Sequence, residues 1–354
     1  MAIPAGALLL AAPLLIVLYR WATDNELSLT AVRVGGAVCI VLLLAFVALF
    51  EVLARESPAD AAAHSESRRP PVVTAEHART LEQSGYAVID GVLSEDVCKR
   101  ARADCASLVA SGAFGTDDLQ QRVVPSVRSD SVCWVSEDEG AGPFHQASAL
   151  KPSKHAALLS ALRSLRAIAR ELQASGVTAV RSNDMGVTRE VQLARYLPSA
   201  AGGSGGRYAA HRDGVPFNTG GLFTRLLSVE TAMRELTSLL YLTEPVAAWA
   251  DEHAAAGVRV LPPRERARVR AGALVLYPGA GPADMTGATA AHIVEILPVG
   301  GRLVLFDARH MLHEVAPHTQ PVERLALSLW IGGAHDPRGF VRHLRTWWLG
   351  AFGL

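Results

Sequence analysis

The chain has 354 residues, half of them hydrophobic, so it is long enough to bury the core of one large domain or two ordinary ones. Acidic and basic residues balance at 34 each, which leaves no net field to attract nucleic acid or an anionic membrane surface. No basic stripe with interleaved aromatic residues occurs either, so we expect no nucleic-acid partner.

The first 53 residues are the most apolar part of the chain. Residues 1–19 carry no charged side chain, and residues 34–50 form a second uncharged run. A spanning helix needs about 20 apolar residues, and both segments approach that length once flanking side chains reach for the interface. We expect residues 1–53 to be a membrane anchor with one or two spans, at about 3–19 and 32–53. A cleaved signal peptide is the alternative for the first segment.

The anchor predicts a membrane location, for example in an endomembrane such as the endoplasmic reticulum. Its orientation stays open because the flanking positive charges nearly balance. Residues 54–73 are rich in Ala, Ser, Pro and charge, and we interpret them as a linker. A soluble domain over 74–335 and a C-terminal tail over 336–354 follow. The tail is too short to span a bilayer, so it either packs on the domain or lies at an interface.

The soluble domain begins with helices. Ser94 can cap a helix over 94–112, with Val97, Ala101, Cys105 and Leu108 on one face. Ser153 can cap a second helix that carries a stripe of leucines: Leu158, Leu162, Leu165 and Leu172. Cys98 and Cys105 would stand about 10 Å apart along the first helix, too far for a disulfide, so a disulfide scaffold is not expected.

Strand-like runs separated by Gly- and Pro-rich turns follow the helices. They cover 191–197, 208–213, 236–243, 273–277, 292–297, 302–306 and 324–331. Many short strands after a helical start predict an α+β domain with a sandwich or barrel core. The strict alternation of strand and helix that a dinucleotide-binding sheet requires is absent.

Three short stretches carry the chemistry. His211 and Asp213 are two residues apart on a predicted strand, so both side chains point to one face. A further histidine follows another strand: His313, with His310 as the competing candidate. Two histidines and one carboxylate with open coordination positions form the ligand set of non-haem Fe(II) oxygenases. Arg324 opens a third strand with apolar same-face neighbours, where a guanidinium can clamp a carboxylate.

The order of several motifs resembles a known family. They are EHARTLEQSGYAVIDGVLS (76–94), Arg128-Ser-Asp130 with Trp134, QLARY (192–196), GRYAAHRD (206–213), TSLLYLTE (237–244), VGGRLVLFDARHMLHEV (299–315) and RLALSLWI (324–331). Together they resemble the prolyl hydroxylase branch of the 2-oxoglutarate/Fe(II) oxygenases, closest to the oxygen-sensing type. The resemblance implies a double-stranded β-helix, a jelly-roll core flanked by the N-terminal helices and preceded by the transmembrane segments.

The resemblance also implies a role for each matching residue. His211, Asp213 and His313 would bind Fe(II), and Arg324 would pair with the C5 carboxylate of 2-oxoglutarate, assisted by the hydroxyl of Tyr241. Tyr196 resembles a tyrosine near the co-substrate, and Ser328 and Trp330 resemble pocket lining. For the two tyrosines a packed core aromatic with a satisfied hydroxyl is the alternative.

The implied enzyme is a dioxygenase that uses Fe(II), 2-oxoglutarate and O2, with ascorbate as reductant. It would hydroxylate prolyl residues of a protein or peptide and release succinate and CO2. Two alternatives stay open. The same chemistry could act on a non-prolyl side chain or on a small or lipid-like molecule, or the jelly roll could be a non-catalytic binding module.

Residues 244–271 depart from the family pattern. This insertion between two predicted strands is rich in arginine: Arg259, Arg264, Arg266, Arg268 and Arg270. We interpret it either as a solvated loop or as a lid or docking surface for an acidic substrate segment. The spacing from His313 to Arg324 is also longer than the family pattern implies, with Pro317 and Pro321 in the turn.

Overall fold

The computed structural model describes residues 71–115, 127–137, 148–175, 190–199, 205–214, 234–246 and 257–332. All of them belong to one compact unit, Pro58–Ala334. The two expected membrane spans, nearly all of the linker and the C-terminal tail lie outside the described residues. Within the described ranges, no helix has both the length and the apolar character needed to cross a bilayer.

The helices of this unit are α4 (Ala75–Ser84), α5 (Glu95–Ala110) and α7 (Ala156–Ala174). The predicted cap of α5 is confirmed, since the Ser94 hydroxyl accepts a hydrogen bond from the amide of Val97. The predicted cap of α7 is wrong. The carboxylate of Asp104, on α5, accepts the amides of Ala157 and Leu158 instead, and an acidic group at a helix N-terminus is favoured by the helix dipole.

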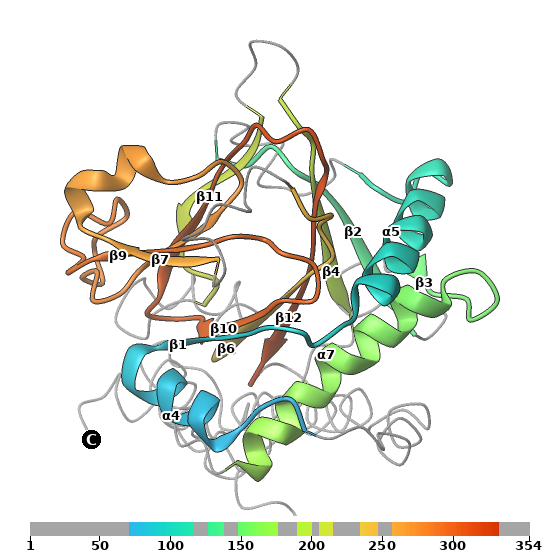
Figure 1. Ribbon diagram of the computed structural model, residues 1–354, viewed down its shortest axis with the longest axis horizontal. Coiled ribbons are helices and arrows are strands. Elements are labelled where there is room, and N and C mark those ends of the chain that lie inside the picture. Colours follow the sequence, from blue (N-terminus) through green and yellow to red (C-terminus); the bar gives the residue numbers. More distant parts are fainter. Residues whose placement is uncertain are drawn as a thin grey trace, which may run out of the picture. The chain divides into compact units, whose positions relative to one another are not determined.

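The strands form two sheets (Figure 1). The larger sheet contains, in order, β1 (Tyr86–Ile89), β10 (Leu303–Asp307), β6 (Leu236–Tyr241), β12 (Arg324–Ile331), β4 (Val191–Tyr196), β2 (Ser131–Ser136) and β3 (Ser148–Ala149). The smaller sheet contains β5 (Gly206–His211), β11 (Leu312–His318), β8 (Leu274–Tyr277), β9 (Ile293–Ile296) and β7 (Val258–Leu261). Every neighbouring pair is antiparallel except β2 and β3. The two facing sheets are consistent with the expected jelly-roll core.

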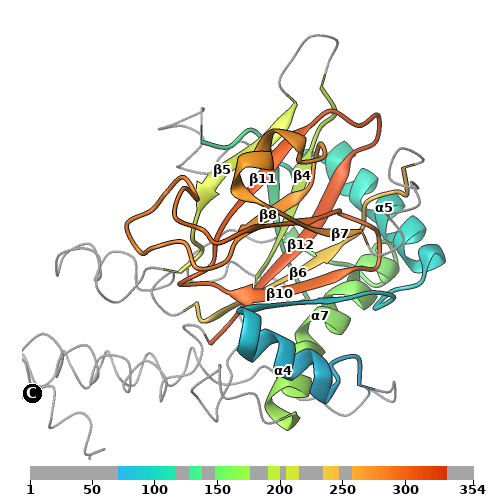
Figure 2. The ribbon, with the colours of Figure 1, turned by 60° about the vertical axis from the view of Figure 1, so that its left-hand side comes forward.

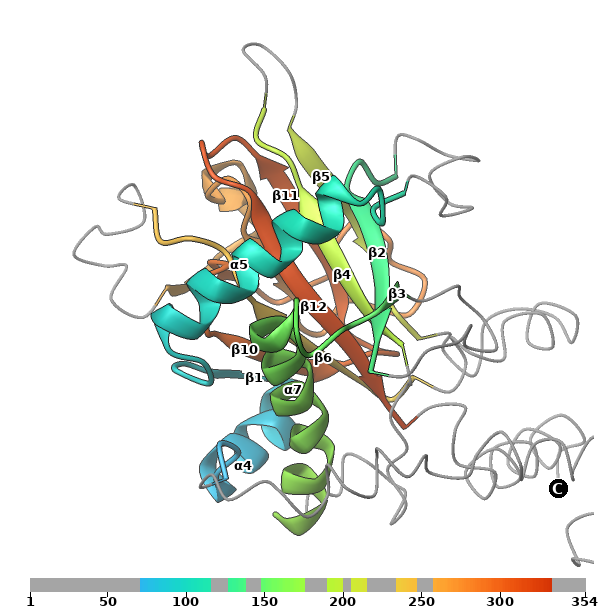
Figure 3. The ribbon, with the colours of Figure 1, turned by 90° about the vertical axis from the view of Figure 1, so that its right-hand side faces the viewer.

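Strand β12 shows how the sheets are packed. Leu325, Leu327 and Leu329 join the core formed with the helices, and Figure 3 shows α5 and α7 covering that face of the larger sheet. Ala326 points the other way and joins a second core between the sheets, to which β8 contributes Leu276. Because side chains alternate along a strand, Arg324, Ser328 and Trp330 share the inner face with Ala326. Figure 2 shows the smaller sheet lying over this face.

The predicted strand runs coincide with β4, β5, β6, β8, β9, β10 and β12, and the structure adds β1, β2, β3, β7 and β11. Strand β7 arises inside the arginine-rich insertion, so the solvated-loop interpretation is wrong for its described part. β7 pairs with β9, and a 3-10 helix, η3 (Pro263–Arg268), follows it.

Four of the insertion's five arginines bind carboxylates of their own domain. Arg259 and Arg270 bind Glu295, Arg266 binds Glu314, and Arg268 binds Glu265. Glu295 is fully buried, and a buried carboxylate requires such cationic partners. These charges therefore hold the insertion against the outer face of the smaller sheet, which gives the docking hypothesis no support.

Candidate metal centre and co-substrate pocket

Two neighbouring strands of the smaller sheet bring the predicted metal ligands together. His211 is the last residue of β5, and it is the register partner of His313 on β11. Asp213 follows β5 by two residues rather than lying on it. One ligand atom from each of these three side chains lies within 4.8 Å of the others, which is close enough for all three to bind a single metal ion.

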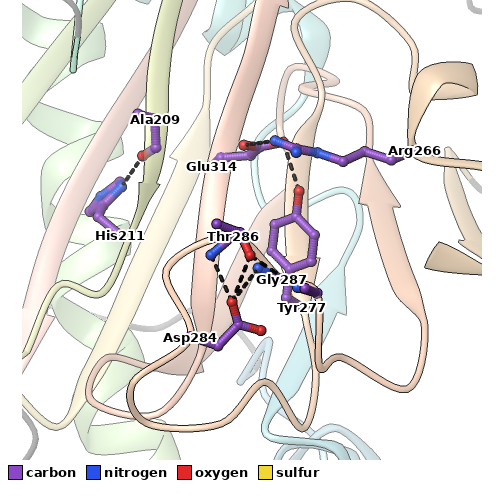
Figure 4. A network of polar contacts seen from close by, with 9 residues as sticks. Ala209, His211, Arg266, Tyr277, Asp284, Thr286, Gly287 and Glu314 are labelled. Atoms are coloured by element: carbon purple, nitrogen blue, oxygen red, sulfur yellow. Dashed lines mark hydrogen bonds and ion pairs between the residues drawn. The ribbon is translucent and has the colours of Figure 1, made fainter. Parts of the chain in front are cut away.

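Backbone carbonyls fix the orientation of both imidazoles. The Nδ1 atom of His211 lies 2.8 Å from the carbonyl oxygen of Ala209, as Figure 4 shows, and the Nδ1 atom of His313 lies 3.1 Å from that of Met311. A hydrogen bond at Nδ1 requires the proton there and leaves the lone pair at Nε2 for a metal. Both Nε2 atoms face the Asp213 carboxylate, at 3.5 Å for His211 and 3.7 Å for His313.

The Asp213 carboxylate is held by Thr237, whose hydroxyl donates a hydrogen bond of 2.7 Å to Oδ2. Burial alone would raise the pKa of Asp213, but the imidazoles of His313 and His211 outweigh it and hold the pKa well below its usual range. Burial, reinforced by His211, lowers the pKa of His313 to about 4. An ionised carboxylate and a neutral imidazole are the ligand forms that Fe(II) requires, so the residues present fit this ion.

His310 does not belong to this cluster. Its side chain is 69% exposed, and its Nδ1 atom contacts the carboxylate of Asp307 at 2.8 Å. Of the two candidates left open by the sequence, the geometry therefore favours His313 as the third ligand.

Arg324 lies deeper between the sheets and is 1% exposed. Its Nε donates to the carbonyl of Gly272 at 3.0 Å, and Nη2 donates to the hydroxyl of Tyr241 at 3.2 Å. Among the described residues, no carboxylate pairs with this guanidinium. A buried cation without a counter-ion is costly, so the position suits an anionic ligand such as the distal carboxylate of 2-oxoglutarate.

The two predicted tyrosines lie beside Arg324. The guanidinium carbon is 4.6 Å from the ring centroid of Tyr196, its register partner on β4, and 5.1 Å from that of Tyr241. Burial raises the pKa of both phenols, so both stay neutral. Tyr241 therefore presents a neutral hydroxyl that is already bonded to Arg324 and can donate to a carboxylate.

The remaining predicted residues line the inner face of β12 toward the metal end. Trp330 pairs in register with Thr237, and Ser328 pairs with Leu239. The guanidinium of Arg234 stacks 3.6 Å from the ring centroid of Trp330, a cation–π contact. Trp134 lies 5.9 Å from Trp330. The indole N–H of Trp330 has no hydrogen-bond partner in the described part of the chain.

Sequence reasoning missed Thr237 and Arg234. Alternation along β6 places Thr237 on the same face as Tyr241, so the strand pattern carried a signal for it. Arg128 and Asp130 form a buried ion pair, and the Arg128 guanidinium stacks on Tyr208, whose ring in turn stacks on His211. This chain of contacts reaches the metal centre from the segment that precedes β2.

Residues 191–332 match the family model of the 2OG-Fe(II) oxygenase superfamily, where 2OG is 2-oxoglutarate. The match covers this part of the chain, and the family that it names implies Fe(II), 2-oxoglutarate and O2. No curated protein matches the chain.

Solved structures similar to the chain include two prolyl hydroxylases. A prolyl-4-hydroxylase from Pseudomonas putida has 18% identity and a TM-score of 0.45, over 73% of this chain and 98% of that chain. A prolyl hydroxylase from Trichoplax adhaerens, in complex with a hypoxia inducible factor oxygen degradation domain peptide fragment, has 20% identity and a TM-score of 0.45, over 74% of this chain and 89% of that chain. The epimerase SnoN from nogalamycin biosynthesis has 15% identity and a TM-score of 0.44, over 73% and 80% respectively.

Proposed function

We propose that the protein is a membrane-anchored dioxygenase that hydroxylates prolyl residues of a protein or peptide. The observation that carries the oxygenase chemistry is the convergence of His211, Asp213 and His313 on one point, within 4.8 Å, together with a buried Arg324 that pairs with no carboxylate of the described residues. A metal site without a co-substrate pocket would not require such a buried arginine.

His211, Asp213 and His313 would hold Fe(II), and three protein ligands leave coordination positions for the co-substrate and O2. Bound Fe(II) supplies the redox chemistry that couples decarboxylation of 2-oxoglutarate, to succinate and CO2, with insertion of one oxygen atom into a C–H bond. The protein's part is orientation: the Ala209 and Met311 carbonyls fix the imidazoles, and Thr237 fixes the carboxylate.

The co-substrate would be anchored at its C5 carboxylate by Arg324 and the hydroxyl of Tyr241. Tyr196 would close the pocket against the guanidinium. Arg324 and Tyr241 are buried, and hydrogen bonds to a charged group are stronger in such low-dielectric surroundings. Ascorbate as a reductant rests on the family resemblance alone.

The assignment of a prolyl substrate rests on the motif order that resembles prolyl hydroxylases, and the geometry near the metal supports it. Trp330 offers a flat indole against which a pyrrolidine ring can pack.

Mass spectrometry of proline-containing peptide libraries tests this proposal. We expect the wild-type protein with Fe(II) and 2-oxoglutarate to add one oxygen atom to prolyl residues, and we expect Asp213→Ala to add none. Products oxidised only at other residues would contradict the prolyl assignment and favour another side chain or a small molecule. Absence of 2-oxoglutarate turnover with every substrate would favour a binding module.

The membrane anchor rests on the apolar runs at 3–19 and 32–53. Alkaline carbonate extraction of membranes from cells that make the full chain tests it. We expect the full chain to stay in the pellet and residues 70–354 to be released. Release of the full chain would contradict the anchor.

A further inference from the structure

Arg212 separates the two proposed ligands His211 and Asp213 in the sequence, and its side chain is held in a cradle of backbone oxygens. Its Nε donates to the carbonyl of His310 at 3.2 Å. Its Nη1 donates to the carbonyl of Asp284 at 3.0 Å, and its Nη2 donates to those of Ala280 and Gly281 at 3.4 and 2.9 Å. The sulfur of Met285 completes the cradle, 3.6 Å from Nη1.

Most of these acceptors belong to the turn that connects β8 and β9, and Asp284 makes that turn rigid. Its carboxylate accepts the amides of Thr286, Gly287 and Thr289, and also the hydroxyls of both threonines. Figure 4 shows the Asp284 carboxylate with Thr286 and Gly287. The carbonyls that meet Arg212 are thus presented by a segment with its own internal hydrogen bonds.

Among the described residues, the carbonyl of His310 is the one acceptor of Arg212 outside this turn, and it links the two segments that carry the ligands. His310 lies in the turn that leads into β11, three residues before His313. The guanidinium therefore joins the end of β5, which carries His211, to the start of the strand that carries His313. Its N–H donors are directed at five acceptors in two separate segments, the β8–β9 turn and the turn before β11, which the three donors of a lysine ammonium group cannot reproduce.

We infer that Arg212 is a positioning residue for the metal centre: its carbonyl cradle sets the separation of the β5 ligands from His313. Within the described residues, each hydrogen bond of the Arg212 side chain ends on a backbone carbonyl or on the sulfur of Met285, so these bonds act on the ligands through the backbone of the segments that carry them. This inference rests on the proposed metal site formed by His211, Asp213 and His313.

Binding of Co(II), used alone as the probe, tests the inference. Its dissociation constant and its visible ligand-field spectrum would be measured for the full chain and for Arg212→Lys, with the melting temperature of each metal-free protein. We expect Arg212→Lys to weaken Co(II) binding by about 10- to 100-fold, as loss of an outer partner of a metal ligand does. We also expect the spectrum of its Co(II) complex to change.

Arg302 provides a matched control. Arg302 is buried, whereas Arg212 is half-buried, and the guanidinium of Arg302 donates to the carbonyls of Gly257 and Leu297 and pairs with the carboxylate of Asp90. It precedes β10 at the end away from Phe306, whose ring contacts His313. Arg302→Lys should lower the melting temperature and leave Co(II) binding by the folded protein unchanged. If Arg212→Lys does not fold, Asp284→Asn loosens the cradle from its far side and should weaken binding in the same direction.

The outcomes separate the inference from the function on which it rests. Failure of the wild-type protein to bind Co(II), or equal binding by Asp213→Ala, would overturn the metal site itself. The positioning role alone would be overturned if the wild type binds Co(II) and folded Arg212→Lys has the same dissociation constant and the same spectrum. An equal loss in Arg302→Lys would also overturn it, because the effect would then be one of general stability.

Discussion

His211 and His313 face each other as a register pair of β5 and β11, with their ring centroids 4.2 Å apart. Each ring nitrogen Nδ1 bonds the carbonyl of the residue two positions earlier, Ala209 or Met311. The same local geometry is thus used twice, once from each strand. These two hydrogen bonds direct both Nε2 atoms toward the carboxylate of Asp213. The proposed chemistry depends on this arrangement.

The assignment of His313 over His310 can be tested by exchanging each for alanine. Loss of a residue that only positions a ligand weakens metal binding by about 10- to 100-fold. His313→Ala should weaken Co(II) or Fe(II) binding by more than this, because it removes a ligand itself. His310→Ala should bind the metal normally, since the His310 side chain is exposed and contacts only Asp307. Isothermal titration of both variants would decide, and the reverse order of effects would refute the assignment.

Thr237 should matter for the metal although it does not touch it. Thr237→Val keeps the shape but removes the hydroxyl that donates to Asp213, so we expect metal affinity to fall by about 10- to 100-fold. Thr237→Ser retains the donor and should stay near the wild type. Equal affinities for the valine and serine variants would show that the hydrogen bond is not needed.

Arg324 should contribute to co-substrate binding far more than to folding. Arg324→Met removes a buried charge that has only neutral partners, Gly272 and Tyr241, so we expect the free energy of unfolding without 2-oxoglutarate to fall by no more than about 1 kcal/mol. The KM for 2-oxoglutarate should rise by about a hundredfold or more, equivalent to about 3 kcal/mol.

Thermal shift measurements check both parts of this prediction. In the presence of a redox-inactive metal, 2-oxoglutarate should raise the melting temperature of the wild type but not that of Arg324→Met, because only a ligand that binds the folded state stabilises it. A strongly destabilised variant would instead assign Arg324 a structural role.

His318 should make stability depend on pH. Burial lowers the pKa of His318 below 6.5; the hydrogen bond to the Val322 carbonyl opposes this shift, and the positive charge of Arg324 adds to it. Below pH 6.5 the unfolded chain then binds more protons than the folded protein. Stability is therefore complete above that pH and is lost as the pH falls toward the folded-state pKa, by up to about 1.4 kcal/mol per pH unit.

Urea denaturation at pH 7 and pH 5 measures this effect. Between these values His318→Gln should lose less stability than the wild type, because glutamine can still donate to the Val322 carbonyl and does not titrate. The same loss in both proteins would mean that other groups dominate acid unfolding.

The strand-borne part of the site could be predicted from the sequence because it depends on local alternation. His211 and Arg324 lie on the strands that were predicted for them, whereas Asp213 reaches the same point from just beyond the end of β5. The stripe of leucines on α7 followed from helical spacing. Asp104 could not be predicted as the group that caps α7, because the contact joins two helices distant in sequence.

The same limit applies to the insertion and to the arginine between the ligands. The sequence of the charge-rich stretch that contains β7 resembles that of a loop, because its pairing partner is distant in the chain. In the structure Arg259 and Arg270 bind the buried Glu295. The sequence around Arg212 gives no sign of the carbonyls to which its guanidinium donates. Both depend on partners that tertiary structure alone brings together.

The most direct test of the proposed chemistry needs no substrate. Residues 70–354 would be mixed with Fe(II) and 2-oxoglutarate without oxygen, beside Asp213→Ala and Arg324→Ala, and the visible spectrum recorded. We predict a weak charge-transfer band of chelated 2-oxoglutarate in the wild type that is absent or much weaker in both variants. A folded, iron-loaded wild-type protein without this band would contradict the account and leave a jelly roll that binds but does not oxidise.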